Sequence, residues 1–166
     1  MIEVINDFLL PDEDIGMSQF FSYEFPWFLG KPTEKDSHGE DDKYNYHFSH
    51  VIYDNYSYNS EYWRLVSPIL QKLNPAALIR IKANLTTCGP KIIEHGYHVD
   101  NEFAGAKTAV FYVNTNDGYT CFQTGEIVYS LKNRLCIFPS ELWHSGTNCT
   151  DTSSRVVINI NYFPKK

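Results

Sequence analysis

Two histidines and one aspartate have the residue types and spacing of metal ligands. His98 and Asp100 are separated by one residue in a strand-like stretch, and side chains alternate across a strand, so both should point to one face. His144 follows 44 residues after Asp100, in Leu-Trp-His-Ser-Gly. Two imidazoles and one carboxylate leave coordination positions open, as in non-haem Fe(II) oxygenases, whereas a structural zinc site uses four protein ligands, often thiolates. Chance alone supplies roughly 0.4 His-x-Asp triplets in a chain of this composition. The triplet therefore indicates a metal site only together with a third ligand.

A cation follows these candidate ligands on a strand that alternates. Arg155 lies eleven residues after His144 and opens the stretch Ser-Arg-Val-Val-Ile-Asn-Ile-Asn-Tyr-Phe. Alternation puts Arg155, Asn159 and Asn161 with Val157 on one face, and an apolar set on the other. A buried guanidinium is costly unless an anion pairs with it, and a bound dicarboxylate would do so through a bidentate hydrogen bond. The alternative is an arginine at a strand end that pairs with a surface acid.

The elements that must position these residues indicate a mainly β fold with flanking helices. We expect an opening strand at 2–8, a short helix from Pro11 to Phe21, and a helix over 61–73 that Pro68 kinks or restarts. Short runs rich in β-branched and aromatic residues follow, broken by turn formers, and they predict strands at 78–86, 91–99, 107–114, 119–123, 126–131, 134–138, 143–147 and 154–163. Such closely spaced runs predict a double-stranded β-helix (a cupin-like jelly roll) faced by the N-terminal helices, in which the long gap before His144 returns the chain to the same end of the barrel.

Length and charge narrow the class of protein. With 166 residues, 43% of them hydrophobic, we expect a single domain, 1–166, in which 1–77 supplies the N-terminal strand, helices and loop and 78–163 the catalytic core. The formal charge is −6 and no basic stripe is present, which disfavours nucleic acid as a substrate. No apolar run is long enough to cross a bilayer and no signal-peptide pattern opens the chain, so we expect a cytoplasmic protein without a membrane partner.

Several other features admit two interpretations. The polar loop 30–45 is either a solvated connection or a lid, and the aromatic stretch 44–63 is core, substrate wall or both. His47 and His50 form a His-x-x-His pattern that we interpret as packing or surface residues rather than a second metal site, and we expect His95 to be exposed. No Cys-x-x-Cys pair suggests zinc or dithiol chemistry. Because no signal-peptide pattern is present, we expect four reduced, mostly buried thiols rather than two disulfides: Cys88, Cys121, Cys136 and Cys149.

Residues 78–163 resemble the catalytic core of the Fe(II)/2-oxoglutarate-dependent oxygenases, in their prolyl-4-hydroxylase-like branch. The resemblance is carried by His-Val-Asp at 98–100, by the distal histidine in Phe-Pro-Ser-Glu-Leu-Trp-His-Ser-Gly, and by the arginine after it. The segment 107–122 also resembles the family's strand ending in Tyr-x-Asn before a glycine-containing turn. The N-terminal part, with Phe-Pro-Trp at 25–27, is similar to small phage-encoded members, whose location would be the host cytoplasm. Asn133 stands where many relatives carry glycine before a strand. This difference bears only on the conformation of that turn.

The resemblance implies a role for each matching residue. His98, Asp100 and His144 would bind iron and form the catalytic centre. The co-substrate 2-oxoglutarate would be bound by four residues: Arg155 and Tyr112 at its far carboxylate, Asn159 alongside, and Asn84 near the metal-bound end.

The activity that the family pattern implies is hydroxylation of a prime substrate. O2 and 2-oxoglutarate would be consumed, and succinate and CO2 released. The prime substrate would be a prolyl or other protein residue or a small metabolite. Two alternatives are a cupin-like metal-binding or sensing protein without oxygenase activity, and a jelly-roll ligand-binding module in which the histidines are incidental.

Overall fold

Two antiparallel sheets make up most of the molecule. The computed structural model describes residues 1–30 and 47–165. The larger sheet runs in the order β1-β9-β6-β11-β5-β3-β2, with β4 beside β3, and the smaller one in the order β10-β7-β8. The strands are β1 (Glu3–Ile5), β2 (Phe28–Leu29), β3 (His47–Asp54), β4 (Ser57–Tyr58), β5 (Pro75–Thr87), β6 (Lys107–Tyr112), β7 (Tyr119–Phe122), β8 (Ile127–Tyr129), β9 (Arg134–Pro139), β10 (His144–Gly146) and β11 (Ser154–Pro164). This is the mainly β architecture that the sequence predicts.

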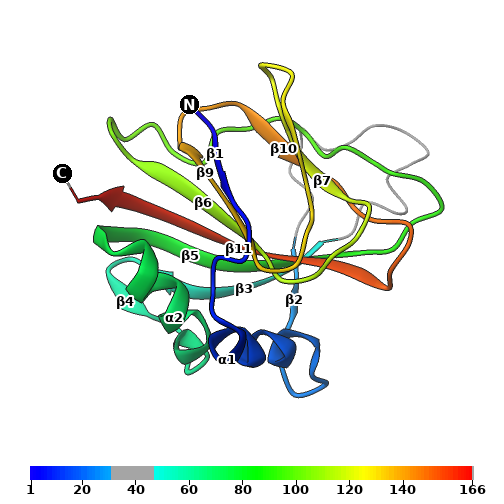
Figure 1. Ribbon diagram of the computed structural model, residues 1–166, viewed down its shortest axis with the longest axis horizontal. Helices are drawn as coiled ribbons and strands as arrows, with labels where there is room; N and C mark the ends of the chain where they lie inside the picture. Colours follow the sequence, from blue (N-terminus) through cyan, green and yellow to red (C-terminus); the bar gives the residue numbers. More distant parts are fainter. Residues whose placement is uncertain (31–46, 166) are drawn as a thin grey trace.

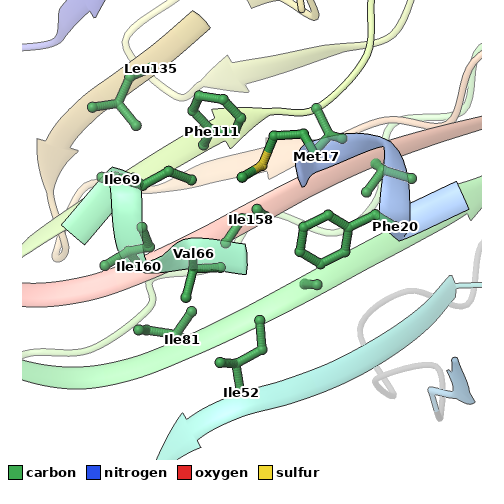
Figure 2. Close-up of a cluster of buried hydrophobic side chains, with 14 of the residues drawn as sticks. Met17, Phe20, Ile52, Val66, Ile69, Ile81, Phe111, Leu135, Ile158 and Ile160 are labelled. Carbon is green, nitrogen blue, oxygen red and sulfur yellow. The ribbon is translucent and has the colours of Figure 1, made fainter. Parts of the chain in front are cut away.

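The helices cover one face of the large sheet. They are α1 (Pro11–Asp14), the 3-10 helix η1 (Ile15–Phe21) and α2 (Trp63–Leu73), and Figure 1 shows them on the opposite side of that sheet from β7 and β10. The main core lies between helices and sheet. In Figure 2, Met17 and Phe20 of η1 and Val66 of α2 point toward the strands, where fully buried isoleucines meet them. The apolar faces of short helices are thereby removed from water, which offsets their low intrinsic stability.

The last long strand divides its side chains as predicted. Val156, Ile158, Ile160 and Tyr162 of β11 belong to the core against the helices. Val157 points the other way, into a second core between the sheets, made by Val110, Tyr112, Phe122, Val128, Cys136 and Phe138. The polar residues of β11 therefore share the face that is turned toward the small sheet.

Two of the strand predictions need correction. Residues 91–99 do not form a strand: their β-bridges to the described residues from His144 on are the isolated pairs Glu94–Thr147 and His98–His144. Pro90 lacks an N–H, and the Asn148 side chain takes the place of a partner strand, accepting from Ile93 N at 2.7 Å. Conversely, β3 lies in the aromatic stretch 44–63 and was missed as a strand; it pairs with β5.

The helical predictions hold in position and differ in form. The segment 11–21 is one α-helical turn followed by a 3-10 helix. The second helix is continuous through Pro68, so the predicted restart is wrong. The hydrogen bond lost there is offset by Val66 and Ile69, which bury their side chains fully beside it. Asn74 ends the helix in a left-handed conformation, with its N–H donated to Leu70 O.

Two further expectations concern the loop and the membrane. The loop predicted at 30–45 falls, apart from Gly30, outside the described residues. Within the described ranges, no helix has the length and apolarity to cross a bilayer.

Candidate active site

The three predicted ligands converge. One nitrogen of each histidine, His98 and His144, and a carboxylate oxygen of Asp100 lie within 4.8 Å of one another. His98 and His144 are held together by a reciprocal backbone pair, with N···O distances of 2.9 and 3.0 Å. Asp100 N donates to Ser140 O at 3.1 Å, which fixes the third residue. The grouping that strand alternation predicted is thus achieved by a bridged irregular segment.

Both imidazoles present the same nitrogen to the centre of this cluster. His98 Nδ1 lies 3.1 Å from Gly96 O, and His144 Nδ1 lies 2.9 Å from Leu142 O. A carbonyl oxygen can only accept, so each Nδ1 must carry the proton, and each Nε2 is left as a lone-pair donor. His144 Nε2 lies 3.8 Å from Asp100 Oδ2. This is the tautomer that an Nε2 metal ligand requires.

The aspartate is oriented by two side-chain donors. Thr108 Oγ1 donates to Asp100 Oδ2 at 2.6 Å, and Asn161 Nδ2 donates to the same oxygen at 3.0 Å. Burial alone would raise the pKa of Asp100, but His144 and the hydrogen bond from Thr108 outweigh it and hold the pKa below its ordinary value. The carboxylate therefore stays ionised, as a metal ligand must be.

The cluster is dry on one side and open on the other. His144 is 3% exposed and packs against the rings of Phe138 and Phe122, with centroids 4.7 and 6.3 Å from its own. Burial lowers the pKa of His144 more than the neighbouring Asp100 raises it, which favours the neutral imidazole. His98 is exposed. A substrate can therefore approach from the side of His98.

Arg155 is buried beside the small sheet, as the alternation on β11 predicts. The residue is 4% exposed, and its Nε donates to Ser130 Oγ at 2.8 Å. Its two terminal nitrogens lie 3.2 Å from Thr120 Oγ1 and 3.4 Å from Thr147 O. Among the described residues no carboxylate forms an ion pair with it, so neutral acceptors alone compensate a buried charge. The alternative of a surface ion pair is wrong.

Tyr112 lies against this arginine. The guanidinium carbon is 5.7 Å from the Tyr112 ring centroid, and the Tyr112 hydroxyl donates to Thr120 Oγ1 at 2.9 Å. Burial raises the pKa of Tyr112, so the hydroxyl keeps its proton and can act as a donor. Gly118 allows this packing, because a Cβ there would lie 2.6 Å from Arg155 Cδ.

The two remaining predicted residues share the face of Arg155. Asn159 is half-buried, and its Oδ1 is buried without a hydrogen-bond partner among the described residues. Asn84 lies opposite Val157 in the β5–β11 register. Along the strands it is therefore nearer to Arg155 than to Asn161. A buried, unpaired amide oxygen is costly and indicates that a ligand supplies its partner.

Sequence reasoning missed the residues beside the triad. Thr108 and Asn161 orient Asp100, and Arg80 Nη2 lies 3.8 Å from Asp100 Oδ1. Lys82 lies opposite Asn159 in the register between β5 and β11. The signal was present in Arg-Ile-Lys-Ala-Asn, which alternates as β11 does, but charged residues on a strand are ordinarily read as a solvent face.

His50, His95 and the cysteines lie outside the three-ligand cluster. Both ring nitrogens of His50 are hydrogen bonded, to Pro26 O and Ser60 Oγ at 2.7 Å each, so His50 packs as expected rather than binding metal. His95 is half-buried, which corrects the expectation that it is exposed; its backbone N–H bonds Gly146 O. All four cysteines are free, and three of them are buried.

Comparison with solved structures places this geometry in a known fold. A prolyl hydroxylase from Trichoplax adhaerens, in complex with a hypoxia-inducible-factor peptide fragment, matches with a TM-score of 0.62 at 13% identity, over 98% of this chain and 83% of that one. The 2-oxoglutarate-dependent epimerase SnoN from nogalamycin biosynthesis matches with a TM-score of 0.67 at 11% identity, over 98% and 77%. HygX from Streptomyces hygroscopicus, with nickel, 2-oxoglutarate and hygromycin B bound, matches with a TM-score of 0.58 at 12% identity, over 99% and 83%.

The chain has the fold of the 2-oxoglutarate-dependent oxygenases. That fold is a jelly roll, which bears out the predicted class. No family model matches the sequence, and no curated protein matches it either. The resemblance of the N-terminal part to phage-encoded members has no support in these comparisons.

Proposed function

We propose that the protein is an Fe(II)- and 2-oxoglutarate-dependent oxygenase, with His98, Asp100 and His144 as the iron ligands. One observation carries the proposal: an open three-ligand cluster and a buried arginine occur together between the two sheets. No carboxylate among the described residues pairs with that arginine. A metal-binding protein without a co-substrate would gain nothing from such an arginine. A jelly-roll binding module would not need the paired imidazole tautomers.

The donor set suits the proposed metal. Two neutral imidazoles and one carboxylate form the facial triad of non-haem iron, and the open positions would accept the co-substrate and O2. When bound, the iron and 2-oxoglutarate supply the oxidising chemistry, and succinate and CO2 are released. The chain itself keeps Asp100 ionised through Thr108 and Asn161 and keeps both Nε2 atoms free through the carbonyls of Gly96 and Leu142.

The co-substrate path would run along β11. Arg155 would bind the far carboxylate in a bidentate manner, supported by Tyr112 and Thr120. Asn159 comes next on the same face, and its buried Oδ1 has no hydrogen-bond partner among the described residues. Asn161 follows it and donates to Asp100. Asn84 would contact the co-substrate from β5. Phe122 and Phe138 exclude water behind His144, which strengthens the electrostatic interactions within the site.

The prime substrate is proposed to be a protein residue, prolyl among them, or a small metabolite. The matched structures include both a complex with a peptide fragment and a complex with hygromycin B.

Succinate formation tests the proposal. The protein is reconstituted anaerobically with Fe(II), and succinate is measured after adding 2-oxoglutarate and O2, with pools of peptides and metabolites. We expect metal-dependent succinate that a productive pool increases. Metal binding without succinate in any pool would favour the cupin-like alternative, and absence of metal binding would favour the ligand-binding module.

A further inference from the structure

Two basic side chains face the candidate site from the strand next to β11. Arg80 and Lys82 alternate with the fully buried Ile81 along β5, so they point away from the main core. The register sets Arg80 opposite Asn161 and Lys82 opposite Asn159. Both cations therefore lie on the face of the sheet that is turned toward the site. Arg80 is beside Asn161, which donates to Asp100. Lys82 is beside Asn159, whose Oδ1 has no hydrogen-bond partner among the described residues.

The described residues give these two cations little negative charge to pair with. Among them, Arg80 has one long contact, of 3.8 Å, with Asp100, the proposed metal ligand. In the part of the chain that the structure describes, the side chain of Lys82 has neither an ion pair nor a hydrogen bond, and burial, followed by the repulsion of Arg80, lowers its pKa. A half-buried ammonium without a partner is destabilising. The presence of Lys82 at this position therefore indicates that a ligand pairs with it.

The charges of the loaded site sharpen this argument. A divalent metal and the Arg155 guanidinium carry positive charge, and Asp100 and a dianionic 2-oxoglutarate carry an equal amount of negative charge. Those four groups neutralise one another. Within residues 1–30 and 47–165, no carboxylate is then left to compensate Arg80 and Lys82.

Arg80 and Lys82 lie away from Arg155, the residue proposed to bind the far carboxylate of the co-substrate. From the large sheet, β6, β9 and β11 contribute to the core between the sheets, and none of its described residues comes from β5 or β3. Val51 of β3, opposite Lys82, is 38% exposed, and the Arg80 side chain is 35% exposed. Arg80 and Lys82 thus lie at the side of the site that faces solvent, where a substrate can reach them.

We propose that Arg80 and Lys82 bind an anionic group of the prime substrate, a carboxylate or a phosphate, and so select acidic substrates. The inference rests on the proposed oxygenase function and adds the chemical class of the substrate. Arg80 would form a bidentate contact at the solvent side, and Lys82 a deeper point contact beside Asn159.

Matched probes test this selectivity. Wild-type protein is loaded with Ni(II) and saturated with 2-oxoglutarate, which occupies Arg155. It is then titrated by calorimetry with two pairs of probes: N-acetylaspartate amide against N-acetylasparagine amide, and N-acetylphosphoserine amide against N-acetylserine amide. We expect the anionic member of at least one pair to bind about tenfold more tightly than its neutral counterpart. Which pair shows the larger preference distinguishes carboxylate from phosphate.

Variants tie the preference to the two residues. Arg80→Gln/Lys82→Gln should abolish it, and the charge-retaining Lys82→Arg should keep it. The control Arg64→Gln/Lys132→Gln removes two exposed cations elsewhere and should bind as wild type does. Titration of each Ni(II) protein with 2-oxoglutarate should give affinities within about twofold of one another.

Equal binding of anionic and neutral probes to wild type would overturn the proposal, as would a preference that survives in Arg80→Gln/Lys82→Gln. A large loss of 2-oxoglutarate affinity in that variant would assign the pair to the co-substrate and also overturn it. Failure of the proposed function is read separately, as absence of 2-oxoglutarate binding in wild type; the probe preference is then measured on the protein without co-substrate and still decides the question.

Discussion

Asn161 and Asp100 are joined by a hydrogen bond of 3.0 Å, across 61 residues of sequence. Asn161 is 1% exposed and also donates to Thr108 Oγ1, the second donor to Asp100. The strand that supplies Arg155 therefore also orients a proposed metal ligand, so both ends of the site depend on the register of β11.

The first prediction concerns this orienting pair. Thr108→Val preserves shape and removes the donor to Asp100, so metal affinity should fall by roughly 10- to 100-fold while the fold is retained. Calorimetric titration with Ni(II) measures the affinity. Thr124→Val, at an exposed turn position, is the control and should bind normally. An unchanged affinity in Thr108→Val would show that Asp100 needs no such support.

The second prediction concerns the ligands themselves. His98→Ala or His144→Ala should abolish Fe(II) binding and turnover without unfolding the protein. His98 is exposed, so its removal should leave the thermal midpoint nearly unchanged, whereas His144 packs between aromatic rings and its loss should lower the midpoint. Metal titration and thermal unfolding are measured together. Full affinity after either change would mean that the ligand assignment is wrong.

The third prediction concerns the co-substrate. Arg155→Ala should weaken 2-oxoglutarate binding by about 2–5 kcal/mol, the usual effect of truncating one partner of a buried charge pair. Tyr112→Phe should cost about 1 kcal/mol, since it removes one neutral hydrogen bond. Titration of the Ni(II) protein measures both, with the exposed Arg64→Ala as control. Wild-type affinity in Arg155→Ala would remove the basis for a 2-oxoglutarate site.

The fourth prediction concerns stability and pH. Lys82→Met keeps a long, unbranched side chain and removes a poorly compensated charge, so the free energy of unfolding without ligands should rise by about 1 kcal/mol at neutral pH. The pKa of Lys82 is lowered in the folded state, so the unfolded state binds more protons as pH approaches the ordinary value of 10.5. Wild-type stability should then gain relative to the variant as pH rises, and denaturant unfolding at several pH values measures the difference. A destabilised variant would mean that Lys82 is well paired in the free protein.

The sequence predicts the site best where local geometry and chemistry coincide. The alternation of β11 places Arg155 and Asn159 correctly because the apolar face of that strand is unambiguous. His98 and Asp100 lie together as predicted, although residues 91–99 form no strand. The backbone hydrogen bonds between His98 and His144 hold this segment beside the third ligand.

What the sequence does not reveal depends on partners far along the chain. β3 was missed because His-Phe-Ser-His-Val-Ile-Tyr-Asp mixes aromatic and polar residues on both faces, and its pairing with β5 decides its conformation. Thr108 has no local mark of function, and the alternation of Arg80 and Lys82 resembles that of a solvent-facing strand. They gain a role only when the sheet register sets them beside Asp100 and Asn159.

The most direct measurement is an anaerobic titration of the Fe(II) protein with 2-oxoglutarate, followed by visible absorption. If His98, Asp100 and His144 hold the iron beside the co-substrate site, 2-oxoglutarate should produce a new charge-transfer band that saturates at one 2-oxoglutarate per iron. The band should be absent in His144→Ala and should require far more 2-oxoglutarate in Arg155→Ala. A wild-type protein that binds iron and shows no band, or a band unaffected by either substitution, would contradict the account.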